Sequence, residues 1–145
     1  MRLNGKWLPC DDGAIRPVIR SELFSADGVW RGLEFLIDTG ADRTVFSATA
    51  LKRPMLPHHA PSIPVGGFGG IAETVIIQTR FRIARDDGVN VIFRGNFAAC
   101  TQIDAIELSV LGRDVLDMFA LILDRPADVV AIIGQDHGYT IYRHR

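Results

Sequence analysis

The sequence has 145 residues, of which 48% are hydrophobic and 23% charged, and its formal net charge is -1. This size predicts one domain, spanning residues 1–145, with room for a hydrophobic core. The near-neutral charge argues against a nucleic-acid partner or an anionic membrane surface, and two cysteines are too few for a disulfide framework. Residues 1–6 lack the apolar core of a signal peptide, and the apolar runs at 119–123 and 129–133 are too short to span a bilayer. We therefore expect a cytoplasmic protein without a membrane span.

Short strand-like runs, separated by Gly, Pro, Asp and Asn, follow one another along the chain. Residues 1–14 are expected to form a lead-in segment and a turn. Strands are expected at 15–24, 29–37, 44–46, 63–65, 71–77, 78–84, 89–93, 96–99, 109–112, 119–124, 129–133 and 140–143. Short helices are expected at 47–51 and 114–118. Many short strands and at most two short helices predict an all-β closed or sandwiched barrel.

The strand expected at 29–37 ends abruptly in a carboxylate, Asp38, which is followed by Thr39 and Gly40. Gly40 permits a tight turn because it has no Cβ. An acid placed by a hydrophobic strand in a tight loop is costly unless it is solvated, hydrogen-bonded or catalytic. An Asp that caps its own turn is the alternative without chemistry.

Two further segments accompany this loop: the glycine-rich run 66–70 and the run Val-Leu-Gly-Arg-Asp-Val-Leu at 110–116. With Asp-Thr-Gly-Ala at 38–41, they resemble, in the same order, three elements of the retropepsins, the retroviral-type aspartic proteases. Residues 38–41 resemble the active-site loop, residues 66–70 the flap tip, and residues 110–116 the apolar-apolar-Gly loop with its short helix. The resemblance covers most of residues 16–123 and implies a retropepsin-like acid-protease half-barrel with one short helix after the Val-Leu-Gly loop. The longer tail after Leu116 is more similar to cellular than to compact viral members.

Enzymes of this family hydrolyse peptide bonds with a water molecule held between two carboxylates that share a proton and titrate as a pair. This chain carries the motif once. The resemblance therefore implies a homodimer in which a second copy supplies the other Asp38. It implies a peptide or protein substrate and no metal or organic cofactor.

The resemblance also implies roles for the residues next to Asp38. Thr39 would form a hydrogen bond across the two-fold axis, and the Gly40 carbonyl would accept one from a substrate amide. Ala41 cannot donate a hydrogen bond toward the acid, so the working pH range is expected to be less acidic than that of pepsin-like enzymes.

Three charged residues are expected to meet behind the loop. Asp42 and Arg113 match family positions that pair, and Arg16 resembles an arginine that reaches the same carboxylate from the partner copy. Such a buried triad serves specific assembly better than net stability. Without the resemblance, Asp42 and Arg113 are two unrelated surface charges. Asp114 is most simply the short helix's own capping or solvated acid.

The remaining implied contacts involve substrate. The glycine cluster would form a flexible lid that excludes water, although a mobile hairpin without that role is the alternative. Arg43 occupies a specificity position and would favour a polar or acidic substrate residue. The residues expected to contact substrate are Ala41, Asp42, Arg43, Gly66, Gly67, Phe68, Gly69, Leu108 and Val110.

Two other functions stay open at this stage. A retropepsin-fold dimerisation or peptide-binding module without turnover would carry the same motifs. A metal-dependent hydrolase using His58 and His59 is the third interpretation, but adjacent histidines without a partner at ligand spacing are typical of a solvated loop.

Overall fold

The computed structural model describes residues 1–52, 58–59, 65–67, 70–102, 104 and 106–134. The strand predicted at 140–143 and the flap-tip residues Phe68 and Gly69 lie outside these ranges. Within them the chain is mostly β-strand, with two short helices, α1 (Ala48–Lys52) and α2 (Arg113–Leu116). The prediction of an all-β chain is confirmed. None of the helices in these ranges is long and apolar enough to cross a membrane.

The strands of the described residues form three sheets. The largest sheet has the order β2-β3-β4-β11-β5-β10-β9-β6, and the others are β1-β13-β12 and β7-β8. The strands are β1 (Arg2–Asn4), β2 (Lys6–Pro9), β3 (Ile15–Phe24), β4 (Trp30–Ile37), β5 (Val45–Phe46), β6 (His58–His59), β7 (Val65–Gly67), β8 (Gly70–Ala72), β9 (Thr74–Ala84), β10 (Asn90–Cys100), β11 (Ser109–Leu111), β12 (Ala120–Asp124) and β13 (Val129–Ile133).

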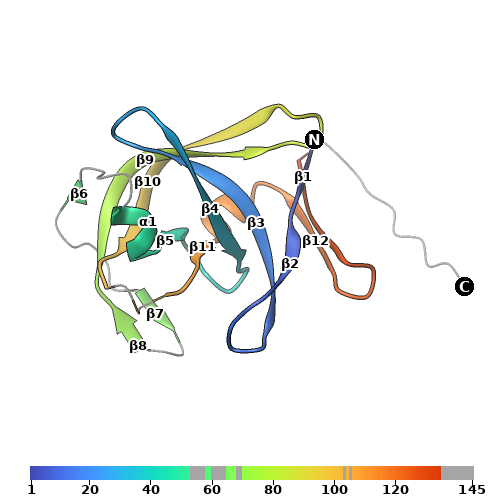
Figure 1. Ribbon diagram of the computed structural model, residues 1–145, viewed down its shortest axis with the longest axis horizontal. Helices are drawn as coiled ribbons and strands as arrows, with labels where there is room; N and C mark the ends of the chain where they lie inside the picture. Colours follow the sequence, from blue (N-terminus) through green and yellow to red (C-terminus); the bar gives the residue numbers. More distant parts are fainter. Residues whose placement is uncertain (53–57, 60–64, 68–69, 103, 105, 135–145) are drawn as a thin grey trace, which may run out of the picture.

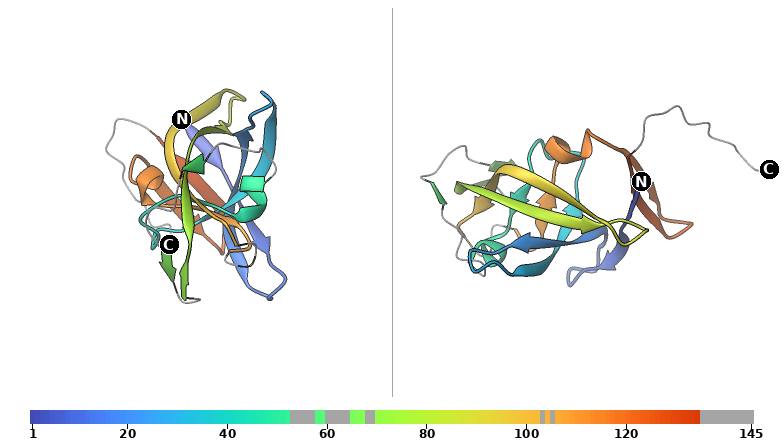
Figure 2. Two further views of the ribbon diagram at one scale, coloured as in Figure 1. Left: turned by 90° about the vertical axis from the view of Figure 1, so that its left-hand side faces the viewer. Right: turned by 90° about the horizontal axis from the view of Figure 1, so that it is seen from above.

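The largest sheet closes on itself because β3 also pairs with β9, through Glu22 opposite Arg82 and Leu23 opposite Phe81. A closed barrel results, as Figure 1 shows. The hairpin of β7 and β8 lies at one end of the molecule, and the small sheet of β1, β13 and β12 lies at the other (Figures 1 and 2).

Phenylalanine side chains fill the barrel. Phe35 on β4 contacts Phe46 on β5 with ring centroids 5.3 Å apart, and Phe81 on β9 contacts both rings. All three are fully buried. Since β4 precedes the Asp38 loop and β5 follows it, this core anchors both ends of that loop.

Three local expectations were wrong. Residues 1–14 contain two strands, because Leu3 pairs with Ile132 of a distant strand and is fully buried there. Residues 90–93 and 96–99 belong to one continuous strand, in which Gly95 pairs with Thr79. His58 and His59 are not in a loop, because their backbone pairs with β9.

Candidate active site

Asp38 directly follows the last residue of β4 and is half-buried. Its backbone N–H donates to the Leu111 carbonyl at 3.2 Å. That bond extends the parallel pairing of β11 with β4, in which Leu111 lies opposite Ile37. The expectation that a strand delivers Asp38 into a loop is therefore confirmed by the backbone.

A tight turn fixes the Asp38 carboxylate. The Ala41 N–H donates to the Asp38 carbonyl at 3.2 Å, and the Gly40 N–H donates to Asp38 Oδ1 at 2.9 Å. Asp38 Oδ2 has no hydrogen-bond partner within the described residues. This geometry is that of an Asp capping its own turn, and it leaves one carboxylate oxygen available for chemistry. Thr39 is exposed and makes no hydrogen bond within the described part of the chain.

Residues 112–114, which follow β11, contact the loop that carries Asp38 and form hydrogen bonds with its backbone. The Arg113 N–H donates to the Ala41 carbonyl at 2.8 Å, and the Asp114 N–H donates to the Asp42 carbonyl at 3.2 Å. Gly112 lies so close that a Cβ there would meet the backbone C and O of Arg43 at 2.4 Å. Glycine is required at this position because of the close approach of two backbones.

A buried threonine joins the two segments. Thr44 is fully buried, and its Oγ1 donates to Asp114 Oδ1 at 2.7 Å while accepting from the Gly112 N–H at 3.1 Å. The Thr44 N–H also donates to Asp114 Oδ1, at 2.9 Å. The Asp114 carboxylate thus accepts from two donors of Thr44, and the Thr44 hydroxyl accepts from a third donor, the Gly112 N–H. These bonds join segments about 70 residues apart in the sequence.

Asp114 is exposed to solvent, as expected, but it does not cap α2; its carboxylate accepts hydrogen bonds from Thr44, whose role was missed. The cap position of α2 is Gly112, which makes no side-chain cap. The available signal was the polar Thr44 at the start of the apolar run Thr44-Val45-Phe46. A threonine buried with such a strand needs a hydrogen-bond partner.

Asp42 and Arg113 form an ion pair, as expected for side chains brought together behind the loop. The hydrogen bond to Asp42 raises the pKa of the Arg113 guanidinium. Within one chain the pair is not buried, since its side chains are 77% and 51% exposed. Arg16 binds Asp12 of its own chain, with Nη2 2.6 Å from Oδ2, and holds the pKa of that carboxyl below its ordinary range.

Among the described residues expected to contact substrate, Arg43, Leu108 and Val110 differ in their surroundings. Arg43 is exposed, and Val110 on β11 packs against the cluster around Val45. Leu108 lines a shallow surface pocket of about 170 Å³, together with Leu33 and Ala50. The structure therefore places Leu108 and Val110 in different surroundings.

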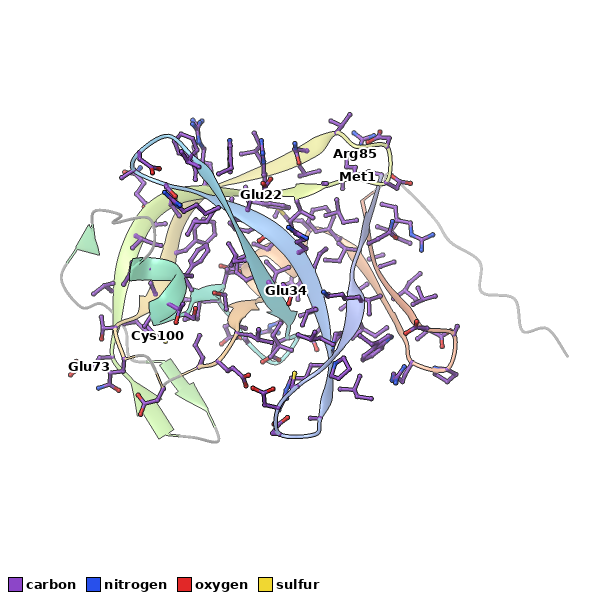
Figure 3. The ribbon with its side chains drawn as sticks, viewed as in Figure 1. Met1, Glu22, Glu34, Glu73, Arg85 and Cys100 are labelled. Atoms are coloured by element: carbon purple, nitrogen blue, oxygen red, sulfur yellow. The ribbon has the colours of Figure 1, made fainter. Side chains whose placement is uncertain are left out.

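The glycines of the expected flap belong to an antiparallel hairpin. Gly66 of β7 pairs with Ile71 of β8, and Gly67 pairs with Gly70. The hairpin leads through Glu73 into β9, close to the end of β10 at Cys100 (Figure 3). A hairpin around the glycine cluster is thus confirmed, while its action as a lid stays a prediction.

Comparisons with known proteins concern the fold. No family model and no curated protein matches the chain. A retropepsin-like aspartic protease from Rickettsia conorii matches with 15% identity over 91% of this chain and 88% of that one, at a TM-score of 0.51. The EIAV protease complexed with the inhibitor HBY-793 matches with 26% identity over 70% of this chain and 86% of that one, at a TM-score of 0.49. The likeness to the Rickettsia structure shows a retropepsin-like fold and confirms the fold expected from the motifs.

Proposed function

We propose that this chain, which has the retropepsin-like fold, is an aspartic endopeptidase that works as a homodimer. One observation supports this most. Asp38 is held at the end of β4 by backbone bonds, and its Oδ2 is left without a partner among the described residues. Two such carboxylates, one from each copy, would share a proton and activate a water for attack on a peptide carbonyl.

The dimer is proposed because each chain brings one Asp38 to chemistry that needs two. Two exposed features of the described chain, Thr39 and the edge strand β12, support a dimer. Thr39 is exposed and makes no hydrogen bond among the described residues, and β12 is an edge of its sheet in the described structure. Met118, Ile122 and Leu123 on and beside this edge are 60%, 43% and 42% exposed. An apolar strand edge of this kind is unusual on a monomer and suits pairing with a second copy.

The hairpin of β7 and β8 is proposed to cover bound substrate. Its glycines would permit close approach to a peptide backbone and the movement needed for entry and release. Substrate held between this hairpin and the Asp38 loop would be shielded from bulk water.

The test is cleavage of an unfolded protein and of a peptide library across a range of pH. Wild type is expected to cleave, and Asp38→Asn is expected to lose activity while keeping its fold and its assembly. Asp11→Asn, which makes the same substitution in an exposed turn, is the matched control and should cleave like wild type. Because the side chain of Ala41 has no hydrogen-bond donor for the acid, the pH optimum of cleavage is expected above the roughly pH 2–3 typical of the pepsin pair.

A dimeric wild type that binds peptides but cleaves none at any pH would favour the rival function, a peptide-binding module without turnover. A wild type that stays monomeric at all concentrations would refute the shared active site. Sedimentation equilibrium run beside the cleavage assay distinguishes these two results.

A further inference from the structure

The outer surface of the barrel carries a cluster of arginine and aromatic side chains, remote from Asp38. It lies where β3 and β9 meet, around Glu22 (Figure 3). Strand register aligns Trp30 with Phe24, Arg80 with Arg94, and Arg82 with Ile92, and register partners project from the same face of a sheet. We call Phe24, Trp30, Arg80, Arg82, Ile92 and Arg94 the arginine–aromatic face.

Aromatic rings hold two of its arginines in place. The Arg80 guanidinium lies 4.0 Å from the centroid of the Phe24 ring, and that of Arg82 lies 4.3 Å from the Trp30 ring. Phe24 and Trp30 contact each other, with centroids 5.0 Å apart. A guanidinium stacked on a ring keeps its N–H edges free and loses less side-chain entropy when it binds a carboxylate.

The face has more positive than negative charge. Among the described residues Glu22 is the one acid that pairs with these arginines, and it binds Arg82 through Nε at 2.6 Å. Arg80 and Arg94 have no acidic partner within the described ranges. Because Glu22 neutralises Arg82, the positive charges of Arg80 and Arg94 remain side by side, on a protein whose formal net charge is -1.

We propose that the arginine–aromatic face binds an acidic, extended segment of a partner polypeptide. Two carboxylates of such a segment would pair with Arg80 and Arg94, which lie opposite each other on neighbouring strands about 5 Å apart. Arginine favours this role because its planar fork binds a carboxylate through two parallel hydrogen bonds.

A polypeptide fits this face better than a nucleic acid. Ile92 is 54% exposed beside the arginines, and it offers an apolar contact that a phosphate backbone does not use. Glu22 also interrupts the positive charge, whereas phosphate tracking needs an extended row of cations. A patch with stacked arginines around an exposed aliphatic residue has the composition of a protein-binding surface.

The face is independent of the proposed catalytic site. Trp30 begins β4 and Asp38 follows its end, so about 26 Å of strand separate them at 3.3 Å per residue. The proposal therefore holds for an enzyme, whose substrate or regulator would carry the acidic segment, and equally for a binding module.

Binding should be measured by fluorescence anisotropy on the Asp38→Asn protein, so that no probe is cleaved. The probe is a labelled peptide of glutamate and alanine with a central leucine. The same peptide with glutamine in place of glutamate, a labelled oligothymidylate and anionic vesicles of phosphatidylglycerol are the comparison ligands. The test variant is Arg80→Gln/Arg94→Gln. Arg125→Gln is the matched control, because Arg125 also lies over a ring, that of Trp7, at 5.6 Å.

The acidic peptide is expected to bind at low salt and more weakly at high salt. The double variant is expected to weaken binding about ten-fold or more, and Arg94→Gln alone about three-fold, while Arg125→Gln stays within about two-fold of the parent. Arg94 makes no ion pair or ring contact within the described residues, so Arg94→Gln keeps the test valid if the double variant unfolds. Absence of binding, equal affinity for the glutamine peptide, tighter binding of the oligothymidylate or vesicles, or an equal loss in Arg125→Gln would each overturn the proposal.

Discussion

The hydrogen bonds of Thr44 make the strongest prediction about stability. Thr44→Val keeps the shape of the side chain but removes the hydroxyl. Asp114 then loses one of its two bonds from Thr44, and the buried Gly112 N–H is left without its acceptor. A hydrogen bond to a carboxylate contributes about 1.5–3 kcal/mol, and an orphaned buried N–H costs about 1–3 kcal/mol. Because Asp114 is itself exposed to water and both losses come from the same hydroxyl, the lower ends of these ranges, about 1.5 and about 1 kcal/mol, apply.

We therefore expect Thr44→Val to lower the free energy of unfolding by about 2–3 kcal/mol. Thr44→Ser is the matched control, since it keeps the hydroxyl and removes one methyl group, at a cost of about 1 kcal/mol. For a chain of this length the Val variant should melt about 5–10 °C below wild type.

The measurement is urea unfolding, with all three proteins at the same concentration so that assembly contributes equally. A Val variant as stable as the Ser variant, or more stable, would mean that the hydroxyl contributes nothing and that shape alone positions Thr44. The same variants in the cleavage assay would then report whether the hydrogen bonds of Thr44 also hold the Asp38 loop in place.

Three further predictions concern neighbouring residues. Gly112→Ala should destabilise by more than about 3 kcal/mol because its Cβ would overlap the opposing backbone, whereas Gly95→Ala, whose Cβ would meet a ring at 3.6 Å, should melt close to wild type. Burial raises the pKa of the Cys100 thiol, so iodoacetamide at neutral pH should alkylate Cys10 first, as mass spectrometry would show; prior labelling of Cys100 contradicts this. Arg113→Ala should reduce dimerisation in sedimentation runs with little change in melting temperature, because its ion pair is exposed in one chain; an unchanged dimer contradicts its role.

Local sequence patterns were enough to place much of the barrel. The strand expected at 15–24 matches β3, and the last hairpin, expected at 119–124 and 129–133, matches β12 and β13 within one residue. Each of these runs is bounded by turn residues that end the strand in its own neighbourhood. Asp38 was placed correctly for the same reason, since the apolar run and the turn glycine are adjacent to it.

Pairings between distant segments were not predictable in this way. Arg2-Leu3-Asn4 has one apolar residue, and its strand exists because β13 lies beside it. Gly95 indicated a break in β10, yet the long pairing with β9 supports a glycine within the strand. The bonds between Thr44 and Asp114 join residues 70 positions apart, and neither residue reveals its partner from its own surroundings.

The Asp38 loop takes its conformation from hydrogen bonds within one chain, whereas the proposed active site also needs a second chain. Asp38, Ala41 and Asp42 are all held by hydrogen bonds from or to residues 111–114 of the same chain. The loop geometry therefore does not depend on a partner. What a second copy would add is the other carboxylate and contacts for the exposed Thr39. On dilution below the dimer dissociation constant, activity should therefore fall with the square of the concentration of chains. The mean residue ellipticity of the β-sheet in circular dichroism should not change. A parallel loss of both would mean that assembly, and not the chain itself, forms the loop.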